Sequence, residues 1–80
     1  MKLDFTPQAR RQLQDLSLKI KNRIEEKIDF YLTKENPLTF AKYLGESLYR
    51  FRVGDYRIIF YIDQDTIYVV KVGRRDKIYK

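Results

Sequence analysis

The sequence predicts an α+β fold in which a helical hairpin packs on an antiparallel sheet, in the order β-α-α-β-β-β. Apolar residues recur at helical spacing between residues 9 and 32, whereas runs of Val, Ile, Tyr and Phe dominate from residue 48 onward. Short turn sequences join these later runs, and short loops connect antiparallel neighbours. With 80 residues and no internal repeat, we expect one small domain over residues 1–80.

The N-terminal half carries the start and stop signals of two helices. A short strand is expected over residues 1–5, after which Thr6-Pro7 supplies an N-cap and a proline at the first helical position. Ser17 interrupts the apolar stripe and can cap a second helix. Asn36-Pro37 ends the helical region, because proline cannot continue the hydrogen-bond ladder.

The C-terminal half reads as a connector followed by a meander. Leu38 to Gly45 is expected to be a connector with at most one helical turn. The strand candidates are Leu48 to Val53, Tyr56 to Ile62, and Thr66 to Val72. Gly54-Asp55 and Asp63-Gln64-Asp65 are the turns between them, and such short turns predict antiparallel pairing.

Composition excludes several classes of function. The chain has no histidine and no cysteine, so imidazole catalysis, thiol nucleophiles and thiolate metal sites are excluded. It contains no Gly-rich phosphate loop, and its paired aspartates Asp63 and Asp65 fit a turn better than a metal site. We expect neither metal nor cofactor. No apolar run reaches the roughly 20 residues that cross a bilayer, and the charged start argues against a signal peptide, so a cytosolic protein is expected.

The net charge of +6 is concentrated as arginine near the predicted hairpin. If Gly54-Asp55 forms a two-residue loop, Arg52 lies directly opposite Arg57, and Arg50 shares their face because side chains alternate along a strand. Like charges directly opposite each other are destabilising, by an amount comparable to the roughly 0.2–1 kcal/mol that a good pair gains. A local cost of this kind indicates a functional site.

The end of the last strand should add two more arginines to this group. In an antiparallel meander that end returns beside Tyr56 and Arg57, which brings Arg74 and Arg75 to the same end of the sheet. Five converging arginines favour a polyanion such as RNA as the ligand, since the planar guanidinium matches phosphate oxygens. The alternative is an ordinary exposed hairpin, neutralised by nearby aspartates and solvent. Tyr79 can stack on a base or pack back on the sheet.

The chain resembles the RelE family of toxins, within the RelE/ParE superfamily. The resemblance rests on the stretch Leu48-Tyr49-Arg50-Phe51-Arg52-Val53-Gly54-Asp55-Tyr56-Arg57-Ile58-Ile59-Phe60, on Val72-Gly73-Arg74-Arg75 and on Ile78-Tyr79. It implies the β-α-α-β-β-β order already expected. It also implies a toxin of a type II toxin–antitoxin system that cleaves messenger RNA in the ribosomal A site, as a ribosome-dependent endoribonuclease. The implied partner is a cognate antitoxin whose helical segment wraps around the toxin in a hetero-oligomer.

Residue roles follow from the same resemblance. Arg50 and Arg52 take the places of two basic residues, usually lysines; Arg57 matches the arginine of the Gly-x-Tyr-Arg segment, Arg75 the arginine after the last strand and Tyr79 the C-terminal tyrosine. These five are the candidate catalytic residues. We further expect Arg74, Lys71 and Lys77 to bind RNA. Because arginine cannot give up its proton, positions 50 and 52 cannot supply the general base that a lysine could supply.

Metal-free transphosphorylation suits such a site, because RNA supplies its own 2′-hydroxyl nucleophile and the protein needs only to position it and stabilise charge. Two other readings remain open. ParE-like members of the superfamily inhibit DNA gyrase and are not nucleases, and a degenerate member could be an inactive antitoxin-binding or RNA-binding module. Convergence of the candidate residues on one patch favours cleavage, whereas arginines on separate faces favour inhibition by binding.

Overall fold

Two helices begin where the sequence places their caps. The computed structural model describes residues 1–78 of the chain. Helix α1 spans Pro7–Gln14 and helix α2 spans Leu18–Leu32. The Thr6 hydroxyl accepts a hydrogen bond from the Ala9 amide at 3.2 Å, and the Ser17 hydroxyl accepts one from the Ile20 amide at 3.3 Å. Each cap thus satisfies one amide that the first helical turn leaves without a partner.

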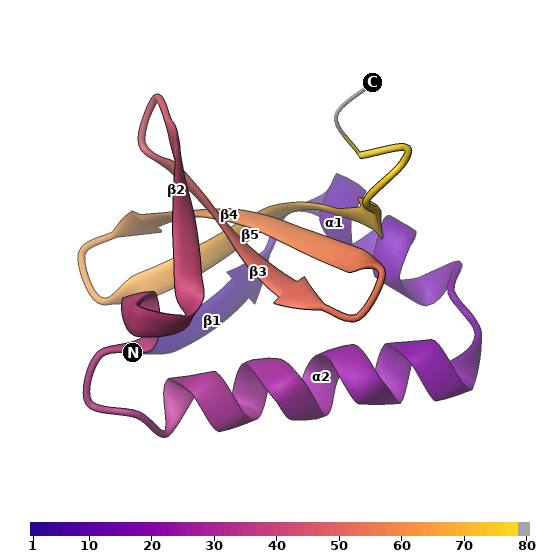
Figure 1. Ribbon diagram of the computed structural model, residues 1–80, viewed down its shortest axis with the longest axis horizontal. Helices are drawn as coiled ribbons and strands as arrows, with labels where there is room; N and C mark the ends of the chain where they lie inside the picture. Colours follow the sequence, from indigo (N-terminus) through magenta and orange to yellow (C-terminus); the bar gives the residue numbers. More distant parts are fainter. Residues whose placement is uncertain (79–80) are drawn as a thin grey trace.

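The sheet has five strands in the order β1-β5-β4-β3-β2 (Figure 1). Neighbouring strands β2 to β5 pair antiparallel, as predicted for a meander. The α+β class and the packing of both helices on the sheet are confirmed. The strands are β1 (Lys2–Phe5), β2 (Ala41–Gly45), β3 (Leu48–Val53), β4 (Tyr56–Asp63) and β5 (Thr66–Arg74).

The predicted connector is wrong in its second half. A 3₁₀ turn, η1 (Pro37–Phe40), is followed by strand β2, which pairs with β3. The turn between them places Glu46 and Ser47 at φ of 53° and 66°, a conformation in which Asn and Gly are the usual residues. The sequence therefore lacks the turn signal that announces this hairpin.

The prediction of a purely antiparallel sheet is also wrong at one edge. Strand β1 lies beside β5 and runs parallel to it, so the sheet is mixed. After β1 the chain passes through α1 and α2, which return it to the far edge of the sheet at β2 (Figure 1). Because no short turn joins β1 to the strand beside it, the chain connection does not require antiparallel pairing there.

The core lies between the helices and one face of the sheet. Strand residues such as Phe51, Ile58 and Phe60 are 0% exposed, while Ile24 and Ile28 of α2 meet them from the helical side. Figure 1 shows α2 along the lower side of the sheet, while the segment that follows β5 rises above it. Within residues 1–78, no helix covers the opposite face of the sheet. In residues 1–78 neither helix is long and apolar enough to cross a membrane.

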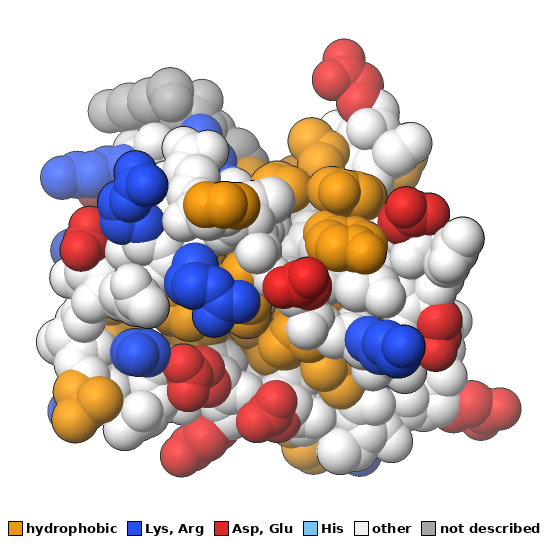
Figure 2. Space-filling view, turned by 180° about the vertical axis from the view of Figure 1, so that it is seen from behind, with side chains coloured by type: hydrophobic (Ala, Val, Ile, Leu, Met, Phe, Trp, Pro, Cys, Tyr) orange, Lys and Arg blue, Asp and Glu red, His pale blue; other side chains and the backbone are white. Residues whose placement is uncertain are grey.

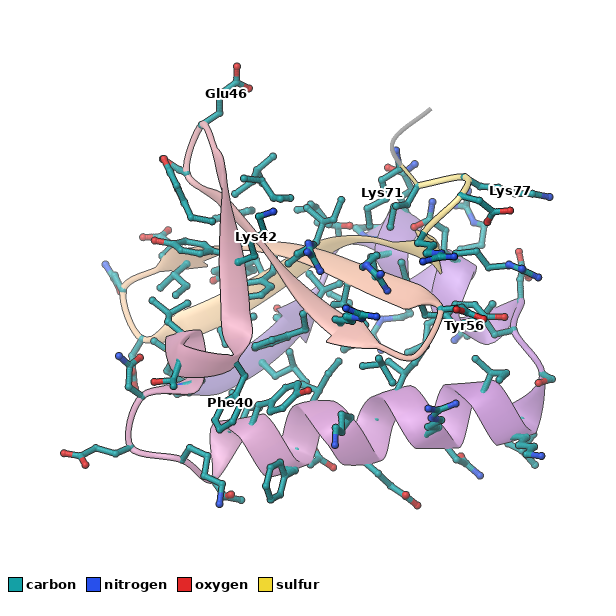
Figure 3. The ribbon with its side chains drawn as sticks, viewed as in Figure 1. Phe40, Lys42, Glu46, Tyr56, Lys71 and Lys77 are labelled. Carbon is teal, nitrogen blue, oxygen red and sulfur yellow. The ribbon has the colours of Figure 1, made fainter. Side chains whose placement is uncertain are left out.

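Tyr31 connects α2, η1 and β3. Its ring stacks on Phe40 at a centroid distance of 4.9 Å and lies 4.8 Å from Phe51. Figure 3 shows Phe40 next to α2. The hydroxyl of Tyr31 donates a hydrogen bond of 3.4 Å to the Arg52 carbonyl oxygen. Burial raises the pKa of Tyr31, because desolvation disfavours the phenolate.

Tyr31→Phe is expected to protect the fold at alkaline pH. The folded-state pKa lies above the unfolded value of about 10, so the stability contributed by the neutral hydroxyl is present below pH 10 and lost as pH rises through the folded pKa. Phenylalanine cannot ionise, and at neutral pH it gives up only one long hydrogen bond, worth about 1 kcal/mol or less. Urea unfolding between pH 7 and 11 measures this. Tyr43→Phe, at an exposed position, is the control. If the free energy of unfolding falls by the same amount between pH 7 and 11 in Tyr31→Phe and in Tyr43→Phe, the prediction is contradicted.

Candidate nucleic-acid interface

The sheet face without helices carries most of the predicted site; we call it the open face. Since side chains alternate along a strand, the buried residues Ile58 and Phe60 of β4 fix the opposite direction for Arg57, Ile59 and Tyr61. The cross-strand register extends this face over the neighbouring strands. The open face comprises Lys42, Arg50, Arg52, Arg57, Ile59, Tyr61, Tyr68, Lys71 and Gly73.

Arg52 and Arg57 are direct cross-strand partners, as predicted. The turn between their strands is Gly54-Asp55, in which Gly54 has a φ of 58° that favours glycine. Arg52 is exposed, so its guanidinium is accessible from the solvent side of the pair. Two cations are therefore held on one face next to the turn. Among residues 1–78, no ion pair joins Arg52 to Asp55.

Arg57 is buried, a property that the position of this residue in the sequence did not reveal. Only 6% of the residue is exposed, and its Nη1 donates hydrogen bonds to the carbonyl oxygens of Gly54 at 2.9 Å and Tyr56 at 3.0 Å. Hydrogen bonds to a charged donor are worth about 1.5–3 kcal/mol, which offsets part of the desolvation cost. The turn thus fixes the guanidinium in place, and the same side chain stabilises the turn.

A second row of cations crosses the open face beside the first. Arg50 is the partner of Ile59 on one side and of Lys42 on the other, and Ile59 is in turn the partner of Lys71. Lys42 and Lys71 are labelled in Figure 3. Lys42 was missed from the sequence because its strand was taken for a connector. Recognition of β2 alone would have placed it beside Arg50.

The C-terminal segment folds back toward the hairpin turn. The Arg75 amide donates to the Asp55 carbonyl oxygen at 2.8 Å, which places the Arg75 backbone at the turn between β3 and β4. Ile78 is 3% exposed, and a side-chain carbon added at Gly73 would lie 3.7 Å from its Cδ1. The segment therefore packs over the end of the open face. Tyr79 lies outside the described residues.

The expected convergence of five arginines is found only in part. Arg50, Arg52 and Arg57 share the open face and Arg75 joins it through its backbone, but Arg74 does not. Arg74 is the partner of Tyr56, so alternation places it on the helix-covered side, and its Nε lies 3.5 Å from an Asp76 carboxylate oxygen. Lys77 is exposed and extends outward from the C-terminal turn in Figure 3.

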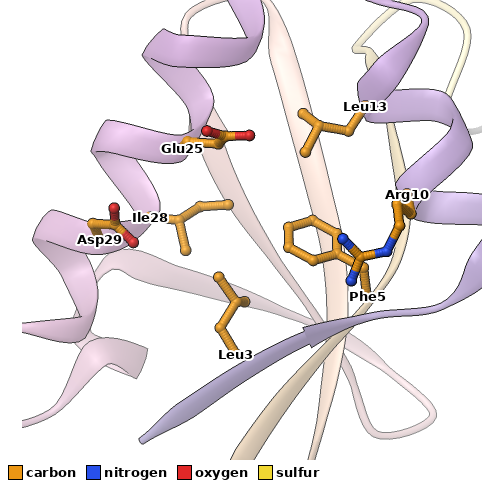
Figure 4. A pocket seen from close by; sticks show the side chains of 7 residues that line it. All are labelled: Leu3, Phe5, Arg10, Leu13, Glu25, Ile28 and Asp29. Carbon is orange, nitrogen blue, oxygen red and sulfur yellow. The ribbon is translucent and has the colours of Figure 1, made fainter.

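Two hollows lie away from the open face. One, of about 210 Å³, is formed by β1, α1 and α2, with Leu3, Leu13 and Ile28 among its apolar lining (Figure 4). The carboxylates of Glu25 and Asp29 also line it, and they would repel a phosphate. The other hollow, of about 400 Å³, is lined by Tyr43, Ser47, Tyr49 and Ile62, which are uncharged. The cationic open face is thus the better candidate for a polyanion.

Acidic side chains are scattered rather than gathered. Among the residues that the structure describes, no three Asp or Glu side chains are placed so that they could hold a metal ion. The charged side chains of the open face, as defined above, are guanidinium and ammonium groups. They can bind phosphate oxygens and stabilise additional negative charge on them.

A comparison with protein-family models identifies the family. Residues 3–79 match the model described as ParE toxin of type II toxin–antitoxin system, parDE. The chain belongs to the RelE/ParE superfamily of toxins. A search of curated proteins finds no match. The match spans nearly the whole toxin and includes the open face and the C-terminal segment that folds toward it.

Solved structures of RelE–RelB complexes are similar to this toxin. The toxin–antitoxin complex RelBE2 from Mycobacterium tuberculosis matches with a TM-score of 0.78 and 29% identity, over 92% of this chain and 90% of that one. The archaeal RelE–RelB complex from Pyrococcus horikoshii matches with a TM-score of 0.71 and 27% identity, over 95% and 96%. The RelB–RelE complex from Methanococcus jannaschii matches with a TM-score of 0.72 and 28% identity, over 94% of this chain and 93% of that one. The toxin therefore shares its fold with RelE toxins.

Proposed function

We propose that this toxin is a ribosome-dependent endoribonuclease that cleaves mRNA in the ribosomal A site. The observation that carries the proposal is the Arg52–Arg57 pair, two cations held opposite each other beside a turn that also receives the Arg75 backbone. Cations that lie directly opposite each other on a sheet suit the binding of an anion such as a phosphate. The likeness to RelE toxins supports the same conclusion.

The reaction that fits the proposal is metal-free transphosphorylation. The 2′-oxygen forms a bond to the adjacent phosphorus while the bond from phosphorus to the 5′-oxygen breaks, leaving a 2′,3′-cyclic phosphate and a 5′-hydroxyl. Arg52, Arg57 and Arg75 stabilise the charge on the phosphorane, as oriented donors do in other phosphoryl transfers. One proton leaves the 2′-hydroxyl and one reaches the 5′-oxygen.

Proton transfer is assigned to the remaining candidates. Tyr79 is proposed as the base that accepts the proton of the 2′-hydroxyl. Arg75 or Arg50 assists the leaving oxygen. Lys71 binds the RNA backbone on the open face, and Arg74 and Lys77 bind it from the side of the C-terminal turn. Phosphate contacts of this kind position the strand without reading its bases.

The proposed partner is a cognate antitoxin. The similar solved structures are complexes of RelE with RelB, so we propose that a helical segment of the antitoxin covers this toxin in a hetero-oligomer. The charge of the toxin fits this role, because an acidic segment would neutralise part of its net charge of +6. The site of action is the cytoplasm, where ribosomes translate.

Gyrase inhibition is the second candidate function. The family model that matches the chain is described as a ParE toxin, which favours this candidate. A catalytically inactive antitoxin-binding or RNA-binding module is the third. The Arg52–Arg57 pair beside the Arg75 backbone weighs toward phosphate chemistry, whereas Arg74 on the other side of the sheet does not.

Expression of the toxin with and without its neighbouring open reading frame distinguishes these candidates. The 5′ ends of cellular mRNA are mapped, and plasmid supercoiling is measured in the same cultures. Cleavage predicts growth arrest with in-frame cuts in translated mRNA and normal supercoiling. Arrest with intact mRNA and failed supercoiling would establish gyrase inhibition instead, and growth without arrest would favour the inactive module.

A further inference from the structure

Two stacked tyrosines lie on the open face beyond the cations. Tyr61 of β4 and Tyr68 of β5 are cross-strand partners, and their rings stack with a centroid distance of 5.2 Å and an interplanar angle of 18°. Both are half-buried. They do not contribute to the core, because the residues on either side of Tyr68, Ile67 and Val69, are the buried ones. A partly exposed aromatic pair is therefore available on the face that carries the arginines.

The tyrosines are in line with the arginine pair. Along β4, Arg57, Ile59 and Tyr61 are successive residues of the open face, and Tyr61 lies about 13 Å from Arg57 at the rise of a strand. Between them, Arg50 and Lys71 flank Ile59. Along β4, the open face thus carries cations at one end and the stacked tyrosine rings at the other. Figure 2 shows the molecule from behind, with basic side chains gathered on one side of that face and a group of hydrophobic ones near the middle of its upper part.

We propose that the Tyr61–Tyr68 pair is a subsite for a base of single-stranded RNA. The phosphates of the strand lie over Arg50, Arg52 and Lys71, and a base a few nucleotides from the arginine pair stacks on the exposed part of the two rings. Aromatic rings beside a cationic track are the usual platform for single strands, since every base has a face that stacks. The inference rests on the proposed function, because it takes RNA as the ligand.

Acidic side chains near the Tyr61–Tyr68 pair limit how far the RNA can extend along the open face. Asp4 of β1 is the partner of Tyr68, but its carboxylate lies 3.8 Å from Arg10, which offsets its charge. Asp63 and Asp65 border the turn that follows Tyr61. These carboxylates repel phosphate, so the RNA backbone turns away from the sheet at this point. The base that stacks on the tyrosine pair is therefore the last one that contacts the open face.

Binding of two matched probes tests the proposal. One probe is fluorescein-labelled 2′-O-methylated hexauridine, which cannot be cleaved by its own 2′-oxygen; the other is a hexamer of abasic tetrahydrofuran-phosphate units, which keeps the phosphates but has no bases. Anisotropy titrations with the full-length toxin are expected to show that Tyr61→Ala binds hexauridine about tenfold more weakly, the loss expected for one stacked base. The affinity for the abasic probe should not change.

Control variants separate stacking from structural damage. Tyr61→Phe keeps the ring and is expected to bind both probes like the wild type. Tyr43→Ala removes a tyrosine that is 58% exposed and lies on the other side of the sheet, and it should also change neither affinity. The proposal is overturned if Tyr61→Ala binds hexauridine like the wild type, or if it weakens both probes equally. It is equally overturned if Tyr61→Ala and Tyr68→Ala lose the antitoxin and keep the affinity for hexauridine.

Failure of the subsite and failure of the proposed function give different results. If the toxin does not cut mRNA on ribosomes but binds hexauridine in a manner that depends on Tyr61, the proposed function fails and the subsite stands. If the toxin cuts mRNA and Tyr61→Ala leaves hexauridine binding unchanged, the subsite alone fails.

Discussion

Arg57→Ala is expected to cleave ribosome-bound mRNA at least about 100-fold more slowly than the wild type, the usual cost of removing one donor that stabilises a transition state. The loss has two sources. The guanidinium that we propose to stabilise the developing charge disappears, and the turn loses the bonds from Arg57 Nη1 to the Gly54 and Tyr56 carbonyl oxygens. Single-turnover cleavage of mRNA on programmed ribosomes measures the rate, and urea unfolding measures the stability.

Two further variants separate these sources. Arg57→Lys keeps a positive charge but not the planar fork, so it is expected to recover only a small part of the rate. Arg11→Ala removes an exposed arginine from α1 and should leave both the rate and the stability unchanged. A folded Arg57→Ala toxin that cleaves at the wild-type rate would remove Arg57 from the mechanism.

Phe60→Ala is expected to have the largest effect on stability. Phe60 is 0% exposed, and its ring lies 4.5 Å from that of Phe51 and 5.6 Å from that of Tyr49. Removing a buried phenylalanine costs about 3–5 kcal/mol, which is comparable to the net stability of a domain of this size. The isolated toxin should therefore be largely unfolded at 25 °C, as seen by circular dichroism and urea titration.

Phe30→Ala provides the matched control for Phe60→Ala. Phe30 is 46% exposed and belongs to α2, with Phe40 at a ring distance of 6.3 Å. Its removal should lower the free energy of unfolding by about 1 kcal/mol or less, as for most exposed positions. Similar losses for both variants would mean that the core is not centred between the helices and β4.

Local signals were sufficient to predict the helices and three strands of the meander. Thr6 and Ser17 cap helices in the structure as their residue types suggest, and Gly54-Asp55 joins two strands in the predicted register. In each case the interaction that decides the structure lies within a few residues along the chain. The α+β class follows from these elements.

The elements that were missed depend on contacts distant in the sequence. Strand β2 contains no β-branched residue and is followed by Glu46 and Ser47 at positive φ, so neither propensity nor turn chemistry indicates it. Figure 3 shows Glu46 at the tip of this hairpin. The parallel pairing of β1 with β5 joins residues more than 60 positions apart, and local sequence does not encode it.

The sequence was sufficient to predict which candidate site residues share one face of the sheet, but not which of them are buried. Alternation was enough to place Arg50, Arg52 and Arg57 on one face. It did not show that Arg57 is buried against two carbonyl oxygens, nor did the sequence reveal Lys42, whose strand was not recognised. The roles of all these residues in catalysis, and that of Tyr79, remain predictions.

The most direct test of the proposed cleavage uses one chemical change in the RNA. Two mRNAs are placed on programmed ribosomes with the purified toxin: one is entirely ribose, and the other carries a single 2′-deoxynucleotide at the scissile position. We expect only the first to be cut, with a 2′,3′-cyclic phosphate and a 5′-hydroxyl at the new ends. Equal cutting of both mRNAs would contradict the account, because the 2′-oxygen would then not be the nucleophile.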